Sequence, residues 1–292
     1  MLGRTTVVLF FLLLVWGNLV AGMKAGLGCP DWPLCHGRVL PPLRLDVYME
    51  FMHRVIAAAA TGFLAVLAFR RLKAYRGVAK AVPVTAAGLV AAEVVIGGFV
   101  VLFELPVQLT TVHFMVGLVV FSLVLYMAWF DGAVRPPRLS SGGVPMLFLV
   151  MAAAVFFQAA LGAYVRHSGS GLACPDFPAC LGGFLPPVMD TRVLAHLSHR
   201  LLAYMILLTA AALYLSTALS GRLRGSQGGA LLLLFLVAGQ IVVGAIVVLS
   251  KLYFMAAAAH LAVALAMLVV LGWMWAREVS RPEGATSWTH RP

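Results

Sequence analysis

Four histidines recur at matched places in the two halves of the chain. His53 and His199 are each followed by arginine and lie 146 residues apart (199 − 53). His113 and His260 each stand near the start of an apolar run, 147 residues apart (260 − 113). The near-equal spacing predicts that these residues form two equivalent pairs.

Imidazoles in apolar segments are candidate ligands for iron. Ionisable side chains are costly inside a membrane and tend to be functional there. Each pair joins two separate apolar runs, which suits bis-imidazole binding of a heme iron between helices. Hydrogen bonding to a neighbouring helix is the alternative for any one histidine. Zinc fits less well, because no cysteine or carboxylate-rich set surrounds them. We predict two heme sites, His53 with His113 and His199 with His260.

The elements that carry these histidines are predicted to be membrane-spanning helices. The 292-residue chain is 62% hydrophobic and 11% charged, whereas soluble domains are about 45–50% apolar and about 25% charged. A spanning helix needs roughly 20 largely apolar residues. The first qualifying stretch could pass for a signal peptide, but its place in the repeat favours a retained helix. The predicted spans of this all-α integral membrane protein are 4–23, 48–69, 82–103, 108–130, 144–165, 193–219, 229–250 and 253–276.

The net charge of +11 would, in a soluble chain, suggest nucleic acid or an acidic partner. Here most positive residues form short clusters between apolar spans, which is how membrane proteins set their orientation. We therefore expect lipid contact and no nucleic acid. The Lys/Arg distribution predicts both termini in the cytoplasm and the cysteine loops on the outer, periplasmic side of a cell membrane.

Two of the predicted outer loops share one motif. Residues 26–35 read Gly-Leu-Gly-Cys-Pro-Asp-Trp-Pro-Leu-Cys and residues 171–180 read Gly-Leu-Ala-Cys-Pro-Asp-Phe-Pro-Ala-Cys, each followed by Pro-Pro and then His-Arg. The constant offsets indicate duplication of a four-helix unit, and an even number of spans per unit gives a parallel repeat. We predict two four-helix bundles, 1–136 and 137–292, joined by the polar stretch 135–143 on the cytoplasmic side.

The two His-Arg helices differ at one position. Glu50 stands three residues before His53, whereas His196 holds the matching place before His199. Positions three apart share a helix face, so this carboxylate could accept a proton, orient a water or hold a cationic intermediate. A helix-start glutamate favoured by the dipole is the alternative. If the copies differ in role, the half with Glu50 is the catalytic one.

Other polar residues lie in or beside the spans. Interhelical hydrogen bonding is the default interpretation for four of them, namely Glu93, Gln240, Asn18 and Gln158. Three arginines near the outer face could pair with heme propionates, since Arg suits carboxylates, or could snorkel to the interface. They are Arg54, Arg166 and Arg200.

Each outer loop also holds a cysteine pair with five residues between its members. The spacing closes a small loop that disulfide geometry permits, and an outer location would let a disulfide persist. A structural clamp, a redox role during turnover and metal coordination are the alternatives. The pairs are Cys29 with Cys35 and Cys174 with Cys180.

With the Cys-Pro-Asp-Trp-Pro-x-Cys loop, the Glu-x-x-His-Arg helix and the four repeated histidines, the chain resembles the heme A synthase family over about residues 10–276. The resemblance implies oxidation of the C8 methyl of heme O to a formyl by successive hydroxylations, giving heme A for aa3-type terminal oxidases. Such an enzyme is an oxidoreductase acting on CH or CH2 groups, with heme O as substrate, heme A as product and a permanent heme b.

Carried onto this chain, the resemblance assigns roles to the candidate residues. It implies that His53 and His113 flank the substrate heme in the first half, and that His199 and His260 hold heme b in the second. Glu50 matches the family's catalytic glutamate. The first cysteine pair matches one implied in substrate delivery or turnover, and the second matches a structural disulfide; these are Cys29–Cys35 and Cys174–Cys180.

One segment departs from the family pattern, and two other functions stay open. Residues 165–171 contain the family's usual Arg-x-Ser-Gly-Ser-Gly-like run, whereas 23–28 is shorter, which puts a propionate contact of the first site in doubt. A di-heme b-type electron carrier and a heme transporter are the alternatives; the Glu50 asymmetry and the cysteine loops favour the enzyme. The prenyltransferase that makes heme O is an expected partner. Small-residue faces such as 97–98 also permit a homo-oligomer, and the sequence does not identify the electron acceptor.

Overall fold

The computed structural model describes residues 1–131, 144–184, 186–219 and 225–280. Within these residues there are eight long α-helices and no β-strand, and all eight are long and apolar enough to cross a membrane. The predicted all-α, eight-helix membrane fold is therefore confirmed. The helices are α1 (Leu2–Gly22), α2 (Leu45–Ala74), α3 (Ala81–Leu102), α4 (Val107–Trp129), α5 (Val144–His167), α6 (Thr191–Leu219), α7 (Gln227–Leu249) and α8 (Phe254–Val279), with short 3-10 turns at Gly77–Lys80 and Ser170–Leu172.

Helix α2 runs to Ala74, past the predicted end of its span at residue 69. Its last turn carries Arg71, and a cation there interacts favourably with the helix dipole. The Arg71 Nε donates to the carbonyl oxygen of Met127 at 2.9 Å, and its Nη1 lies 2.7 Å from Oδ1 of Asp131. The helix therefore continues beyond its apolar run because its polar end is paired with the end of α4.

The turns that join α3 to α4 and α7 to α8 are built alike. Leu105 and Leu252 both have positive φ, 62° and 67°. The side chain of Leu105 packs against Gly26, and that of Leu252 packs against Gly171. Each of these glycines lies at the start of a cysteine loop. Similar sequences in the two halves thus adopt the same local conformation.

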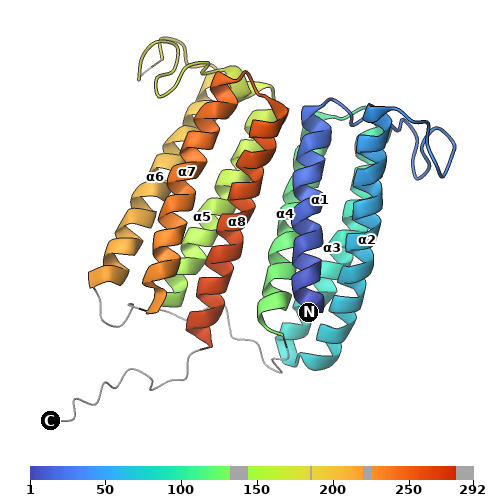
Figure 1. The fold of residues 1–292 in the computed structure, drawn as a ribbon, viewed down its shortest axis with the longest axis horizontal. Helices are drawn as coiled ribbons and strands as arrows, with labels where there is room; N and C mark the ends of the chain where they lie inside the picture. The colour runs from blue at the N-terminus through green and yellow to red at the C-terminus, as the bar shows by residue number, and fades with distance from the viewer. Residues whose placement is uncertain (132–143, 185, 220–224, 281–292) are drawn as a thin grey trace.

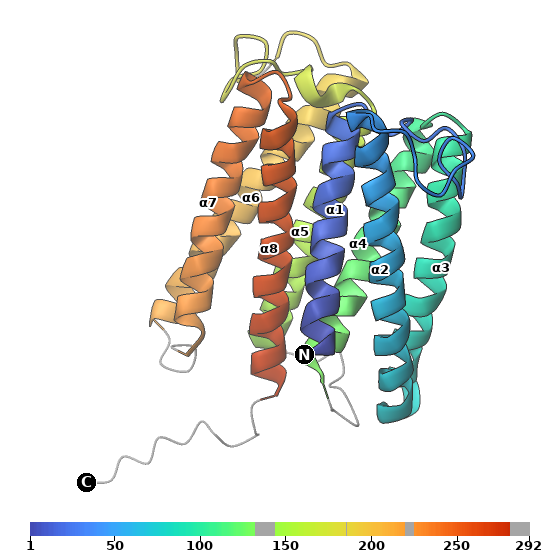
Figure 2. The ribbon, with the colours of Figure 1, turned by 45° about the vertical axis from the view of Figure 1, so that its right-hand side comes forward.

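The eight helices form two four-helix bundles that lie side by side, α1–α4 and α5–α8 (Figure 1). Across the boundary α1 packs against α8 and α4 against α5, an arrangement also visible in the turned view (Figure 2). One cluster of buried apolar side chains extends through both bundles. Its fully buried members at the centre include Leu118 and Phe121 of α4 and Leu265 and Leu271 of α8.

Both cysteine loops emerge at the same end of the molecule, one between α1 and α2 and the other between α5 and α6 (Figure 1). Helix α1 begins, and α8 ends, at the opposite end. This arrangement agrees with an even number of spans per bundle. The duplication and the orientation in the membrane stay predictions. The predicted linker 135–143, with the domain boundary at 136 and 137, lies outside the described residues.

Candidate heme sites and their supporting loops

The second bundle brings together the rings of His199 from α6 and His260 from α8. Their centroids are 6.4 Å apart and their planes make an angle of 62°. Both Nδ1 atoms are buried without a hydrogen-bond partner. Two metal–imidazole bonds of about 2 Å, added to the two ring radii, would separate the centroids by roughly 6 Å. The pair therefore fits the predicted bis-histidine binding of one heme iron.

Two glutamines hold the helices that carry this pair. Gln158 of α5 donates its Nε2 hydrogen to the carbonyl oxygen of His199 at 2.8 Å. Gln240 of α7 donates in the same way to the carbonyl oxygen of His260 at 2.9 Å. Interhelical hydrogen bonding was the prediction for both glutamines, and it is confirmed. The spacing of the two rings thus depends on all four helices of the bundle.

Each of the four candidate ligands lies against a glycine of a neighbouring helix. A Cβ atom at that glycine would lie within 2.9–3.1 Å of the imidazole Cε1. Since interiors are close-packed, a larger residue would displace the ring. The sequence did not predict these glycines as site residues; the signal that could have found them is their matching position in the two halves. The contacts are Gly17 with His53, Gly97 with His113, Gly162 with His199 and Gly244 with His260.

The variant Gly162→Ala should weaken heme binding in the second bundle by about tenfold or more, because the new methyl would lie 2.9 Å from Cε1 of His199 and overpacking costs about 1–3 kcal/mol. Heme retained per chain after dilution in detergent measures the effect. Gly239→Ala on α7 is the matched control, since a Cβ atom there meets nothing within 4 Å. Equal heme retention in both variants would contradict the packing argument.

The first bundle repeats the histidine pair with one addition. The Nδ1 atoms of His53 on α2 and His113 on α4 are buried, and each ring lies against a glycine of a neighbouring helix. Oε1 of Glu93, on α3, lies 3.1 Å from Nδ1 of His113, at ion-pair distance but outside good hydrogen-bond alignment. A carboxylate therefore lies beside one ring of this pair, where the second bundle has an amide that faces the backbone.

Glu50, the predicted catalytic residue, is buried in the first turns of α2. Its Oε1 accepts a hydrogen bond from Nε of Arg54 at 3.0 Å, and the two side chains are only 8% and 16% exposed. A buried carboxylate needs such a partner, since an unpaired buried charge is strongly destabilising. The pair holds a carboxylate three residues before His53, on the same helix face.

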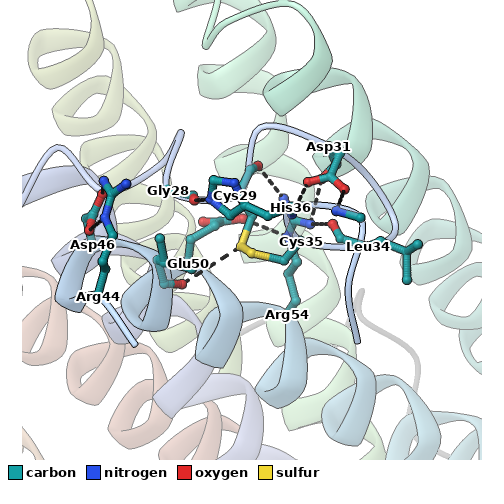
Figure 3. Close-up of a disulfide and its surroundings, with 12 residues drawn as sticks. Gly28, Cys29, Asp31, Leu34, Cys35, His36, Arg44, Asp46, Glu50 and Arg54 are labelled. Atoms are coloured by element: carbon teal, nitrogen blue, oxygen red, sulfur yellow. Dashed lines mark hydrogen bonds and ion pairs between the residues drawn. A yellow bond between two sulfur atoms is a disulfide. The ribbon is translucent and has the colours of Figure 1, made fainter. Parts of the chain in front are cut away.

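Arg54 also fixes the cysteine loop of the first bundle (Figure 3). Its Nη1 donates to the carbonyl oxygens of Asp31 and Leu34 at 2.8 and 2.7 Å, and its Nη2 donates to that of Cys29 at 3.0 Å. With the bond to Glu50, this occupies most of the five N–H donors of a guanidinium. The predicted propionate contact of Arg54 is untested, and only the remaining donor is free for it.

Arg200 fixes the second loop with the same geometry. It donates to the carbonyl oxygens of Ala179 at 2.7 Å and of Cys174 and Asp176 at 2.8 Å each. The arginine of each His-Arg motif therefore connects a helix that carries a candidate ligand to its cysteine loop. The propionate role predicted for Arg200 is likewise untested.

His196, which holds the place of Glu50 in the second bundle, contacts the loop backbone. Its buried Nδ1 lies 3.0 Å from the carbonyl oxygen of Ser170 and 3.4 Å from the backbone nitrogen of Cys174. The predicted difference between Glu50 and His196 is thus a difference in surroundings as well. One bundle has a carboxylate paired with arginine, and the other has an imidazole bonded to a loop.

Both predicted cysteine pairs form disulfides. The Cα atoms of Cys29 and Cys35 are 4.7 Å apart and those of Cys174 and Cys180 are 4.5 Å apart, within the usual range for a disulfide. All four cysteines are buried beneath the loops. The pairing itself is therefore confirmed, whereas the distinction between a structural clamp and a redox role stays open.

An aspartate turn closes each loop. The Asp31 carboxylate accepts hydrogen bonds from the backbone N–H groups of His36 and Gly37 at 2.6 and 2.7 Å, and Asp176 accepts two at 2.8 Å. The N–H of Gly37 is the main cause that lowers the pKa of Asp31, and Gly182 does the same for Asp176. These bonds stabilise the loops fully at a pH above the ordinary carboxyl pKa. The stabilisation is lost as the pH falls through the lowered pKa values of Asp31 and Asp176.

The variant Cys174→Ser should reduce the yield of folded protein more than the activity per bound heme. Opening a disulfide loop this short costs about 2 kcal/mol in the chain-entropy account, and the second loop holds His196 and Arg200. Yield after membrane extraction and activity per heme are the two measurements, with Cys29→Ser as the matched variant. Full yield with loss of activity would instead favour a redox role for this pair.

Arg166, in the last turn of α5, reaches across the boundary between the bundles. Its Nη1 and Nη2 donate to Oδ1 and the carbonyl oxygen of Asn18 on α1, both at 3.3 Å. The neighbouring His167 Nδ1 lies 3.2 Å from Oγ1 of Thr111 on α4. These contacts join the two bundles near the end that carries the cysteine loops. The propionate contact predicted for Arg166 is untested. The interhelical hydrogen bonding predicted for Asn18 is confirmed, although Arg166 was not predicted as its partner.

The chain matches the COX15-CtaA family, described as cytochrome oxidase assembly protein, over residues 2–271. A heme A synthase of Alkalihalophilus pseudofirmus is 31% identical over 253 residues, which cover 82% of this chain and 84% of that protein. A heme A synthase of Geobacillus thermodenitrificans is 28% identical over 270 residues, 88% of this chain and 84% of that protein. Because the match extends through both bundles and their histidine pairs, this chain belongs to the COX15-CtaA family of cytochrome oxidase assembly proteins.

Proposed function

We propose that this chain is a heme A synthase, an enzyme that oxidises the C8 methyl group of heme O to a formyl group by successive hydroxylations. The product, heme A, would serve aa3-type terminal oxidases. The observation that carries the proposal is a histidine pair with buried Nδ1 atoms in each bundle and a buried carboxylate, Glu50, in only one. Relatives named heme A synthase, similar over most of the chain, support the same activity.

In the first bundle, His53 and His113 would bind the iron of the substrate heme from its two faces. Conversion of a methyl to a formyl group with oxygen from water releases protons and electrons, so the site needs a nearby base. We assign this role to Glu50, which is buried near the start of the same helix as His53. Arg54 would keep the carboxylate in position and connect it to the Cys29 loop.

In the second bundle, His199 and His260 would hold a permanent heme b. A b-type heme bound there supplies one-electron transfer. The chain's own part is a rigid site, since each ring lies against a glycine and each ligand-bearing helix accepts a bond from a glutamine. His196 in place of Glu50 removes the carboxylate base, which favours a non-catalytic role for this bundle.

The protein is a multi-pass membrane protein, and we place it in the cell membrane with both cysteine loops on the outer side.

The upstream enzyme is then a prenyltransferase that makes heme O in the same membrane, and direct contact would avoid release of a poorly soluble heme. Purification of this chain from native membranes should recover that prenyltransferase. Its absence from the purified material would contradict a stable complex.

Chromatography of hemes extracted from cells that make heme O, with and without this chain, tests the proposed activity. We expect heme A, or its hydroxylated precursor, only when the chain is present. If only hemes b and O are found with an intact, heme-loaded protein, the di-heme electron carrier becomes the better account.

A further inference from the structure

We infer that Glu93 is a positioning residue that lowers the reduction potential of iron bound at the first-bundle site, acting through His113. The second bundle has no equivalent carboxylate. The inference deepens the proposed function and rests on its assignment of His113 as an iron ligand. Glu93 is neither a member of a histidine pair nor one of the two residues, Glu50 and His196, that distinguish the His-Arg helices.

The position of the Glu93 carboxylate is the first observation. Its Oε1 lies 3.1 Å from Nδ1 of His113, and the side chains of the two residues are 16% and 27% exposed. Its Oε2 is buried without a hydrogen-bond partner. In the part of the chain that the structure describes, its ion-pair partner is His113 alone. A carboxylate in this position needs a donor, and the Nδ1–H of His113 is the donor at hand.

The space around Glu93 is the second observation. A Cβ atom at Gly117, one helical turn after His113, would lie 3.1 Å from Oε1 of Glu93. Glycine at this position therefore leaves room for the carboxylate beside the imidazole. In the second bundle, Ala264 stands four residues after His260, as Gly117 stands four residues after His113. The extra room is present only where the acid is present.

The corresponding residue of the second bundle does something else. Gln240 gives its amide hydrogen to the carbonyl oxygen of His260, and Nδ1 of His260 has no acceptor. The two bundles thus present their candidate ligands with different surroundings. Nδ1 of His113 faces the carboxylate of Glu93. The backbone carbonyl of His260 is bonded to Gln240, and Nδ1 of His260 has no acceptor.

This difference has a definite chemical effect on a bound iron. When an imidazole binds metal through Nε2, Nδ1 carries the proton, and a carboxylate that accepts this proton raises the basicity of the ligand. A more basic axial ligand stabilises ferric over ferrous iron and lowers the reduction potential. Oε1 lies 3.1 Å from Nδ1 of His113, within reach of its N–H. Glu93 therefore lowers the potential of the first site and leaves that of the second unchanged.

A redox titration of the full chain, loaded with iron protoporphyrin IX at both sites, tests the inference. Glu93→Gln should favour the ferrous form of one heme about tenfold, a rise of about 59 mV for a one-electron couple, and leave the other heme unchanged. Glu104→Gln is the matched control, because it removes the same charge from the exposed turn after α3. The reciprocal double variant Gln240→Glu with Ala264→Gly should lower the potential of the other heme.

Unchanged potentials in Glu93→Gln, with two hemes still bound per chain, would overturn the role of Glu93. Equal shifts of both hemes would overturn it too, since a general loss of structure affects both sites. The ligand assignment fails separately: if His113→Ala still binds two hemes with bis-histidine spectra, the proposed first site is wrong whatever Glu93 does.

Discussion

Replacing Glu50 with glutamine should lower the rate of heme A formation by about 10²–10⁴-fold, the usual contribution of a general base, while both hemes stay bound. Glutamine keeps the size of the side chain and an oxygen that can accept the Nε–H bond of Arg54, but it cannot take up a proton. The measurement is the time course of heme O consumption, followed by chromatography of extracted hemes.

Two further variants separate the chemistry of Glu50 from its structural role. Glu50→Ala should also lose heme A formation and retain the second-bundle heme. It also removes the carboxylate partner of Arg54, which should loosen the Cys29 loop. Asp46→Asn, one turn earlier on α2 and exposed in a pair with Arg44, is the matched control and should convert heme O normally. Normal conversion by Glu50→Gln would remove Glu50 from the catalytic step.

Replacing His199 with alanine should remove the heme b of the second bundle. The variant deletes one of the two imidazoles whose centroids are 6.4 Å apart, and a single remaining histidine cannot complete bis-histidine binding. We expect the heme b content to fall by about one heme per chain and its low-spin spectrum to disappear. His260→Ala should give the same result, since both ligands serve one iron.

His196→Gln provides the control for that experiment. His196 is on the same helix and is buried, but it contacts the loop backbone at Ser170. The variant should therefore retain heme b, with a lower stability of the Cys174 loop. If His199→Ala keeps a full complement of heme b, or if His196→Gln loses it, the assignment of ligands in the second bundle is wrong.

The comparison of the two bundles shows which features around the candidate ligands are shared and which differ. The parts that position the ligands are shared, since Arg54 and Arg200 fix their loops alike and every ligand lies against a glycine. The parts that differ are the residues next to the ligands. Glu50 and Glu93 are acids in the first bundle, and His196 and Gln240 hold the matching places in the second. The two bundles thus differ in the residues beside the candidate ligands.

The sequence by itself determined the number and type of elements and the identity of the candidate ligands. Lipid requires long apolar helices whose backbone bonds are satisfied internally, so the eight spans could be predicted from composition along the chain. The predicted ends were less accurate, because α2 continues to Ala74 through an ion pair that only the fold creates. The spacing of the cysteines permitted disulfides but did not exclude metal coordination, and the structure shows the pairing.

Only the tertiary structure decided what surrounds those ligands. Contacts such as Gly162 with His199, Gln158 with the backbone of His199, and Arg166 with Asn18 join residues far apart in the chain. They depend on how each helix is rotated and how closely it approaches its neighbours, and a single sequence does not record either quantity. The loop carbonyls that Arg54 binds, and the carboxylate beside His113, were unpredictable for the same reason. Residue type supplies the chemistry, and helix packing selects which groups meet.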